Sequence, residues 1–296
     1  MKILLLGKNG QVGHELQRTL LPLGRLTSKG RGEVDLVDLD RLGETIRTEA
    51  PDIIVNAAAY TAVDRAEEDE DTANKVNAAA VGLMAEYAAD TNALLVHYST
   101  DYVFDGEKAG AYTESDATNP QSAYGRSKLA GEEAILRSGC KAFIFRTSWV
   151  FSSHGGNFVK TIIRLANERD TLGIVADQIG APTSAELIAD VTGLAIAACK
   201  SGAISTGVYH LAASGEVSWH GLASHIVNSL HENNNGVKLK VADIRPITTD
   251  DYPLPAKRPK NSRLGTSKLS KALNIEIPHW TIYVDRTLAQ LTRAES

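Results

Sequence analysis

Short apolar runs alternate with helical stretches along the first half of the chain. The runs are Ile3–Leu6, Ile53–Val55, Leu94–Val96 and Phe143–Phe145. Each is strand-sized, and each of the later three follows a stretch of helix-like composition. Continuous apolar strands separated by helices form a parallel sheet that is covered on both faces. The pattern therefore predicts an α/β fold with a Rossmann-like, doubly wound parallel sheet.

The pattern loosens after Trp149, where loops and a proline-rich stretch at 252–259 become frequent. We therefore expect a dinucleotide-binding domain at 1–150 and a smaller C-terminal, mainly substrate-binding portion at 151–296. No long linker separates the two, so we expect them to share one cleft. The segments around 183–200, which opens with a capping box, and 240–250 are candidates for returning to the first domain.

Three glycines follow the first apolar run directly. Gly7, Gly10 and Gly13 are spaced three apart, and apolar residues then recur at helical spacing over 12–20. Such a turn lets the backbone approach a pyrophosphate, while the free N–H groups at the start of the helix favour an anion. The spacing differs from the Gly-x-Gly-x-x-Gly fingerprint, so a glycine turn without a ligand stays open as an alternative. Its place between a strand and a helix favours a nucleotide cofactor.

A second chemical pattern is Tyr124-x-x-x-Lys128, with Thr100 upstream at the end of a predicted strand. Residues four apart share a helix face, so we expect the Lys128 ammonium to lower the pKa of the Tyr124 phenol. Such a phenol is a general acid or base near neutral pH, and the Thr100 hydroxyl can bind a substrate oxygen beside it. By itself, a tyrosine four residues before a lysine is more often an exposed pair of side chains on a helix with no catalytic role. Together with the glycine turn it predicts a catalytic site.

Charge and composition narrow the class of partner. The net charge of -5 and the pI of about 5.9 disfavour a nucleic acid. No apolar run approaches the ~18 residues that a membrane span needs, so we expect a cytoplasmic protein with a small-molecule substrate. Cys140 and Cys199 are too few for a disulfide framework. No spacing of metal ligands is found, so no metal site is predicted and Mg²⁺ has no support.

Several motifs together resemble the extended short-chain dehydrogenase/reductases. They are the glycine turn, 56–64, 98–104, Tyr124-x-x-x-Lys128 and 146–151; the motifs at 177–183, 209–211 and 258–264 extend the resemblance to nearly the whole chain. Within this superfamily the chain is most similar to the dTDP-4-dehydrorhamnose reductase family. The resemblance implies NAD(P)H-dependent reduction of the C4 ketone of dTDP-4-dehydro-L-rhamnose to dTDP-L-rhamnose. That oxidoreductase step belongs to nucleotide-sugar and cell-surface polysaccharide biosynthesis.

The resemblance also implies roles for individual residues. Tyr124 would protonate the alkoxide, Lys128 would hold the nicotinamide ribose and lower the Tyr124 pKa, and Thr100 would orient the carbonyl oxygen. Asp101 and Trp149 would face the sugar. A capping role for Asp101 and a core role for Trp149 stay open as alternatives.

Basic residues bear on the recognition of both nucleotides. An acidic residue after the second strand would accept the ribose 2′-OH of NADH, but Lys29 and Arg31 stand there. NADPH is therefore predicted, and Glu33 keeps NADH open. Arg258, in a proline-flanked basic stretch, is a candidate for binding the substrate diphosphate, with a solvated loop as the alternative.

The expected sites are as follows. The catalytic residues are Thr100, Tyr124 and Lys128. The substrate-binding residues are Thr100, Asp101, Tyr124, Trp149 and Arg258. The cofactor-binding residues are Gly7, Gly10, Gln11, Val12, Gly13, Lys29, Arg31, Asp35, Leu36, Ala59, Tyr60, Thr61, Tyr98 and Lys128.

The residues after Thr100 bear on other functions found in the same superfamily. A 4,6-dehydratase would place an Asp-Glu pair after the hydroxyl residue, but Thr100 is followed by Asp101 and Tyr102, so elimination is disfavoured. The alternatives left open are a reductase that gives dTDP-6-deoxy-L-talose and a non-catalytic, nucleotide-binding regulatory subunit. A homodimer is expected from the resemblance.

Overall fold

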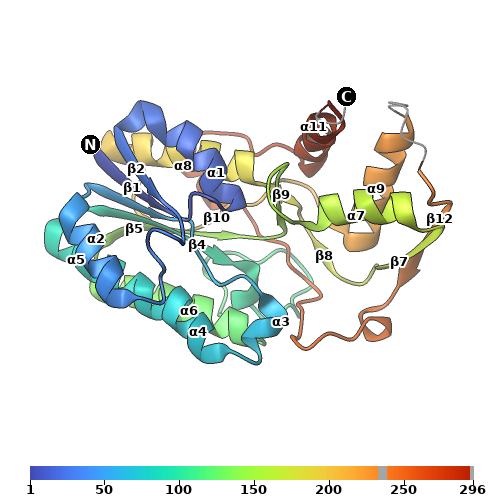
Figure 1. The fold of residues 1–296 in the computed structure, drawn as a ribbon, viewed down its shortest axis with the longest axis horizontal. Coiled ribbons are helices and arrows are strands. Elements are labelled where there is room, and N and C mark those ends of the chain that lie inside the picture. Colours follow the sequence, from blue (N-terminus) through green and yellow to red (C-terminus); the bar gives the residue numbers. More distant parts are fainter. Residues whose placement is uncertain (233–238, 294–296) are drawn as a thin grey trace.

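A six-stranded, wholly parallel sheet forms the centre of the larger of two parts (Figure 1). The computed structural model describes residues 1–232 and 239–293. In spatial order the strands are β10 (Gly207–His210), β5 (Lys141–Thr147), β4 (Leu94–Thr100), β3 (Ile53–Asn56), β1 (Lys2–Leu6) and β2 (Arg25–Lys29). The strand order reverses between β1 and β3, and ligands of open α/β sheets bind at such a switch point. The predicted Rossmann-like fold is confirmed.

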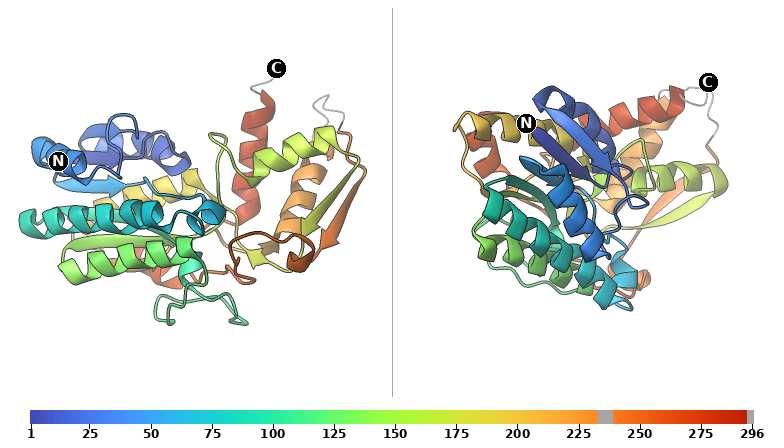
Figure 2. Two further views of the ribbon diagram at one scale, coloured as in Figure 1. Left: turned by 60° about the horizontal axis from the view of Figure 1, so that its bottom comes forward. Right: turned by 60° about the vertical axis from the view of Figure 1, so that its left-hand side comes forward.

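The side chains of β1 divide the core into two layers. Ile3 and Leu5 pack in one hydrophobic cluster, and Leu4 and Leu6 pack in the other, because successive side chains of a strand point to opposite faces. The first layer is covered by α1 (Gln11–Leu20) and α8 (Ala185–Lys200), and the second by α2 (Leu39–Glu49), α5 (Ala80–Thr91) and α6 (Ala123–Ser138). Figure 2 shows these helices on opposite sides of the sheet.

Short elements follow β3 and β4 at the cleft side of the sheet. They are α3 (Val63–Ala66), α4 (Glu70–Asn74), a π-helical turn η2 (Lys75–Ala79) and η3 (Asp101–Val103), whereas η1 (Leu21–Leu23) joins α1 to β2 at the opposite edge. The strand β4 ends directly in η3, which puts Thr100 and Asp101 at the carboxyl edge of the sheet.

The smaller part is built from short strand pairs and three helices. The pairs are β7 (Thr171–Val175) with β12 (Asp243–Ile247), β8 (Ile179–Gly180) with β11 (Val217–Ser218) and β6 (Val150–Phe151) with β9 (Thr183–Ser184). The helices are α7 (Phe158–Glu168), α9 (Trp219–Glu232) and α11 (Trp280–Arg293); η4 (Thr249–Asp251) and α10 (Ser267–Leu273) complete the elements.

The chain crosses between the two parts more than once. The segment 183–200 contains α8, which packs beside α1, and β10 then adds the sixth strand to the central sheet. The segment 240–250, a candidate for the same return, instead contains β12, which pairs with β7 in the smaller part. β12 supplies the hydrogen-bonding partner of β7 in this two-stranded sheet. None of the helices within 1–232 and 239–293 has the length and apolar character to cross a bilayer.

Gly13 lies where the first turn of α1 crosses the end of β1. A Cβ at this position would overlap the carbonyl oxygen of Gly7, which is backbone and has little room to move. We expect Gly13→Ala to lower the free energy of unfolding by about 1–3 kcal/mol, measured by urea denaturation. The matched control is Gly193→Ala in α8, where the nearest atom to a Cβ is the Thr19 carbonyl oxygen at 3.5 Å. Equal stabilities for the two variants would contradict the close packing of α1 on β1.

Candidate active site

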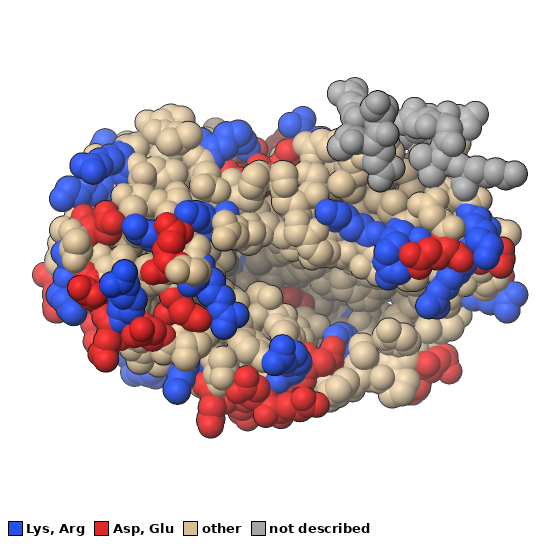
Figure 3. Space-filling view, in the orientation of Figure 1, with Lys and Arg blue, Asp and Glu red and all other residues tan. Residues whose placement is uncertain are grey.

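A cleft of about 750 Å³ runs along the carboxyl ends of β1, β3, β4 and β5. Figure 3 shows the molecule hollowed between its two parts, with the charged side chains of this face lying mainly to the sides of the hollow and below it. Most residues predicted for the site line this cleft: Gly7, Gly10, Gln11, Val12, Arg31, Asp35, Leu36, Ala59, Tyr60, Thr61, Tyr98, Thr100, Asp101, Tyr124, Lys128 and Trp149.

Three predicted residues lie outside this lining. Gly13 packs on Gly7 and so shapes the turn from behind. Lys29 ends β2 with its Nζ atom 3.6 Å from a carboxylate oxygen of Glu49. Arg258 lines a second cavity, described below. The structure therefore separates these three from the residues that face the cleft.

The glycine turn has the geometry of an anion-binding loop. Gly7 has a φ of +88°, and a Cβ there would lie 2.6 Å from the Ala58 nitrogen, so the position requires glycine. At the N-cap of α1, Gly10 offers no side chain to bond the first N–H groups of the helix. Those donors face the cleft, where the helix dipole also favours a negative charge.

Thr100 and Asp101 are both buried at the end of β4. The Thr100 hydroxyl donates to Asp101 Oδ1 at 3.0 Å and accepts from the Tyr102 backbone N–H at 3.2 Å. Burial raises the pKa of Asp101 to about 6, against the effect of hydrogen bonds from Ser262 and Thr100. Thr100 is thus held in one orientation by its neighbours, with its hydroxyl at the floor of the cleft.

Tyr124 lies in the first turn of α6, two residues after the N-cap Ser122. The Ser122 hydroxyl accepts from the Gly125 N–H at 3.1 Å. Its ring packs edge-on against Tyr102, with ring centroids 5.5 Å apart. Burial raises the pKa of Tyr124, and a hydrogen bond with Thr100 acts in the opposite direction. The expectation that the pKa of this phenol is lowered is therefore wrong for this structure. A neutral phenol is nevertheless the form that can donate a proton.

Lys128 is fully buried one helical turn after Tyr124. Its Nζ atom donates to the Tyr98 carbonyl oxygen at 2.6 Å and lies 3.1 Å from Nε2 of His97. These contacts draw the ammonium toward β4, which explains why it does not lower the Tyr124 pKa. Burial lowers the pKa of Lys128 to about 8, and the Glu132 carboxylate opposes this shift. The same burial, together with Lys128, holds the pKa of His97 well below its usual range.

Trp149 presents its indole to the cleft from the loop that joins the two parts. Its backbone has a φ of +49°, which is unusual for a residue with a side chain and is maintained only by surrounding packing. The indole stacks on Trp219, with ring centroids 3.5 Å apart, and Gly180 also packs against it. Trp149 is therefore both packed, as the core alternative required, and exposed to the cleft.

The comparisons with known proteins agree with this geometry. The family model described as the RmlD substrate binding domain matches residues 1–293. The chain belongs to this family. It is 48% identical to the dTDP-4-dehydrorhamnose reductase of Burkholderia thailandensis, over 95% of each chain, and 44% identical to that of Salmonella typhimurium, over 98% of each.

A solved structure of a dTDP-4-dehydrorhamnose reductase from Bacillus anthracis, in complex with NADP, superposes on this RmlD-family chain with a TM-score of 0.86. It is 33% identical, and the alignment covers 98% of this chain and 99% of the other. The family that the motifs predicted is thereby confirmed, as is the fold class.

Asn77 is a buried residue behind this RmlD-family cleft, and no role was assigned to it from the sequence. Its Oδ1 accepts from the Tyr60 N–H at 2.9 Å, and its Nδ2 donates to the Tyr60 carbonyl at 3.1 Å and to the Ser127 hydroxyl at 3.0 Å. It thus joins the loop after β3 to α6. The sequence did contain a sign of this role, because asparagine is unfavourable in the interior of a helix. In the structure Asn77 lies in the π-helical turn η2.

A second cavity of about 950 Å³ lies in the smaller part, next to the cleft. It is lined by apolar side chains that include Phe158, Trp219 and Leu254. The charged residues of the lining are the cationic Arg164, Arg169, Lys257, Arg258 and Lys260 and the acidic Asp105, Glu107 and Asp250. The Arg258 guanidinium donates to both oxygens of Asp64 in α3, at 2.9 and 2.7 Å. This ion pair lowers the pKa of Asp64 and fixes Arg258 at the boundary between the two parts.

Proposed function

We propose that the protein reduces the C4 ketone of dTDP-4-dehydro-L-rhamnose with NADPH to give dTDP-L-rhamnose. The observation that carries this proposal is that Thr100, Tyr124 and Lys128 line the same cleft as the glycine turn. The names of the relatives from Burkholderia thailandensis and Salmonella typhimurium support the substrate. The NADP complex of the Bacillus anthracis protein supports the cofactor.

The cleft fits a dinucleotide along its whole length. The unpaired N–H groups after Gly10 would bind the diphosphate, and Asp35 and Leu36 would lie at the adenine end. Residues 59–61, which Asn77 holds, would line the middle, and Tyr98 and Lys128 would lie at the nicotinamide ribose. When bound, NADPH supplies the hydride that becomes the C4 hydrogen of the product.

Tyr124 would supply the proton of the same reduction. As the ketone carbon gains the hydride, its oxygen becomes an alkoxide, and the phenol O–H of Tyr124 transfers its proton to that oxygen. The Thr100 hydroxyl, which donates to Asp101 Oδ1 and accepts from the Tyr102 N–H in this structure, would turn its single proton to the ketone oxygen and so orient it. The phenolate left behind would then regain a proton from solvent.

The smaller part would hold the nucleotide of the substrate. Its cavity is next to the cleft, since Trp219 of its lining stacks on Trp149 of the cleft. The lining combines apolar side chains, which suit an aromatic base, with five cationic side chains against three acidic ones, and the cationic side chains suit a diphosphate. We accordingly assign cofactor binding to 1–150 and substrate binding mainly to 151–296, with α8 and β10 belonging structurally to the first part. Trp149 and Asp101 would face the sugar between the two sites.

The cofactor preference is testable at Arg31. This side chain lines the cleft next to Gly30, is largely exposed and pairs with Asp35 at 3.0 Å. We expect the parent enzyme to have a higher kcat/KM with NADPH than with NADH, and Arg31→Ala to raise the KM for NADPH about tenfold, because one phosphate contact is lost. Lys29→Ala, outside the cleft lining, is the matched control. A parent preference for NADH would contradict the assignment.

Arg258 provides a test of substrate binding. We expect Arg258→Ala to raise the KM for the sugar nucleotide by roughly ten- to a hundredfold and to leave the affinity for NADPH nearly intact, since a charge-assisted contact contributes ~1.5–3 kcal/mol. Asp64→Asn keeps the size of the side chain but removes the charge that holds the Arg258 guanidinium. It should therefore raise the KM for the sugar nucleotide by less than Arg258→Ala does. Unchanged KM in both variants would assign the basic stretch to solvent.

The proposed reaction itself is tested with purified protein, NADPH and a dTDP-4-keto-6-deoxy-L-sugar. We expect NADPH oxidation coupled to formation of dTDP-L-rhamnose, identified by NMR from the configuration at C4. A dTDP-6-deoxy-L-talose product would show hydride attack on the opposite face, and binding without turnover would indicate a regulatory subunit. The homodimer and the cytoplasmic location stay predictions.

A further inference from the structure

A buried histidine lies behind the cleft, and the proposed reduction gives it no task. His97 belongs to β4 and is 1% exposed. Its Nε2 atom lies 3.1 Å from Nζ of Lys128. Its Nδ1 atom lies 3.3 Å from Nδ2 of Asn56, the residue beside it on the neighbouring strand β3. Both ring nitrogens therefore face a nitrogen that carries protons.

The orientation of the Asn56 amide is fixed from its other side. The backbone N–H of Ala58 donates to Asn56 Oδ1 at 3.1 Å, and a backbone N–H can only donate. The amide oxygen therefore faces Ala58, and the amide NH₂ group faces His97. Because that NH₂ group is a donor, Nδ1 of His97 must be the acceptor of this hydrogen bond.

The position of the ring proton of His97 follows from this contact. Burial, together with Lys128, holds the pKa of His97 well below its usual range, so the imidazole is neutral and carries one proton. Since Nδ1 accepts, that proton is on Nε2 and points at Nζ of Lys128. Nζ can accept a hydrogen bond only as a neutral amine, because an ammonium has no lone pair. The hydrogen bonds that run from Ala58 to Lys128 are therefore all satisfied only with the neutral amine.

The other titratable side chains beside Lys128 act differently from His97. They are Tyr124 and Glu132 of α6, Tyr98 of β4, Asp101 of η3 and Arg146 of β5. Glu132 favours the ammonium, but its carboxylate pairs with Arg146, with Oε2 and Nη2 2.6 Å apart. Burial raises the pKa of both phenols, so they carry no charge near neutral pH. Asp101 accepts instead from the Thr100 hydroxyl, at 3.0 Å.

We propose that His97 is a positioning residue that links the protonation of Lys128 to the loop after β3. In the free enzyme its Nε2–H group stabilises the neutral amine. When Lys128 becomes an ammonium, the imidazole proton moves from Nε2 to Nδ1, and the Asn56 amide turns its oxygen to Nδ1 and releases the Ala58 N–H. The net uptake is one proton, which is held on Nζ.

The link ends at the cofactor cleft, because Ala58 is part of its lining. The charge of Lys128 and the hydrogen bonding of the loop after β3 should therefore change together. The use of this link in the reduction rests on the proposed function. The tautomer of His97 does not, since it is measured without cofactor or substrate.

The test is the tautomer of His97, read from the ¹⁵N chemical shifts of its ring in labelled, tag-free protein. We expect the proton on Nε2 in the parent at pH 9, because the pKa of Lys128 is about 8, and on Nδ1 at pH 6.5. His97→Gln identifies the signal by its loss. Lys128→Met cannot become charged and should keep the proton on Nε2 at both pH values.

Asn56→Asp separates the link from the effect of burial. One carboxylate oxygen can keep the bond from the Ala58 N–H while the other accepts from Nδ1, so the ring proton should stay on Nδ1 at both pH values. Nε2 then accepts from the ammonium, and the pH at which NADPH affinity falls should rise by about one unit. Asn92→Asp adds the same charge at the exposed C-cap of α5 and should change neither readout.

A parent with its proton on Nδ1 at pH 9, or with its proton still on Nε2 at pH 6.5, would overturn the proposal. This measurement does not depend on the folding of any variant. The same tautomer at pH 9 in the parent and in folded Asn56→Asp would overturn it as well. A protein that shows the expected tautomers but does not reduce the sugar nucleotide would support the link and contradict the proposed function.

Discussion

Tyr124→Phe should lower kcat by roughly 10²–10⁴ while the fold and NADPH binding survive. The substitution keeps the ring that packs against Tyr102 and removes only the hydroxyl. Burial raises the pKa of Tyr124, so the parent phenol is protonated at neutral pH and can act as a donor. The decisive measurement is single-turnover oxidation of NADPH with a 4-keto sugar nucleotide, because this isolates the chemical step from product release.

Two variants serve as controls for Tyr124→Phe. Tyr102→Phe removes the neighbouring phenol, which also lines the cleft, and should stay within about threefold of the parent. Thr100→Val deletes one hydrogen bond and not the proton itself, so it should cost less than Tyr124→Phe. A folded Tyr124→Phe enzyme that reacts within threefold of the parent would mean that the proton comes from another residue or from water.

Lys128→Met should abolish most of the activity and also weaken NADPH binding. Methionine has a similar length and no charge, so it fills the buried space but removes the donor to the Tyr98 carbonyl. We expect kcat to fall by about 10²-fold or more and the dissociation constant for NADPH to rise about tenfold. The Tm should stay close to that of the parent, because the cost of burying an ammonium disappears together with its hydrogen bonds.

The pH dependence of cofactor binding gives a second readout for Lys128. Its pKa is lowered to about 8, so the ammonium is charged below that pH and loses its proton above it. The affinity of the parent for NADPH should therefore fall as the pH rises through about 8, since the cation is lost. Lys128→Met should lack this step, whereas Lys75→Met, an exposed lysine of η2, should retain it. A step of the same size in Lys128→Met would assign it to another group.

Local patterns were enough to predict the frame of the molecule. The apolar run at Ile3–Leu6 could be recognised as a buried strand from its own residues. A strand of a parallel sheet is covered on both faces, so it has no position for a polar side chain. Gly7 and Gly13 could be assigned to a tight turn for a similar reason, since the turn and the helix packing exclude a Cβ. Tyr124 and Lys128 share a helix, so their spacing alone placed them on one face.

Contacts between distant segments decided the rest. The sequence placed Lys128 next to Tyr124, but only packing against β4 shows that its ammonium bonds to Tyr98 and His97 and leaves the phenol with a raised pKa. The pairing of β12 with β7, and not with the central sheet, depends on which strand edge lies within reach.

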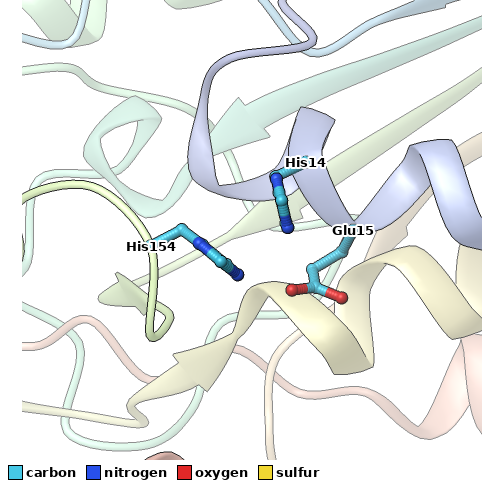
Figure 4. A group of neighbouring side chains, drawn as sticks. All are labelled: His14, Glu15 and His154. Carbon is cyan, nitrogen blue, oxygen red and sulfur yellow. The ribbon is translucent and has the colours of Figure 1, made fainter. Parts of the chain in front are cut away.

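Two further groups of side chains come together only in the folded chain. Arg258 was recognisable as a cation, but its partner Asp64 lies in α3, far earlier in the chain, and no spacing rule connects them. His14, Glu15 and His154 come together only when the loop after β6 folds back onto α1 (Figure 4). Sequence determined the elements and the chemistry that each carries, because these depend on neighbours a few residues away. The tertiary structure determined the direction of the Tyr124 pKa shift, the ion pair of Arg258 with Asp64, and which side chains from distant segments meet. All of these depend on distances across the fold.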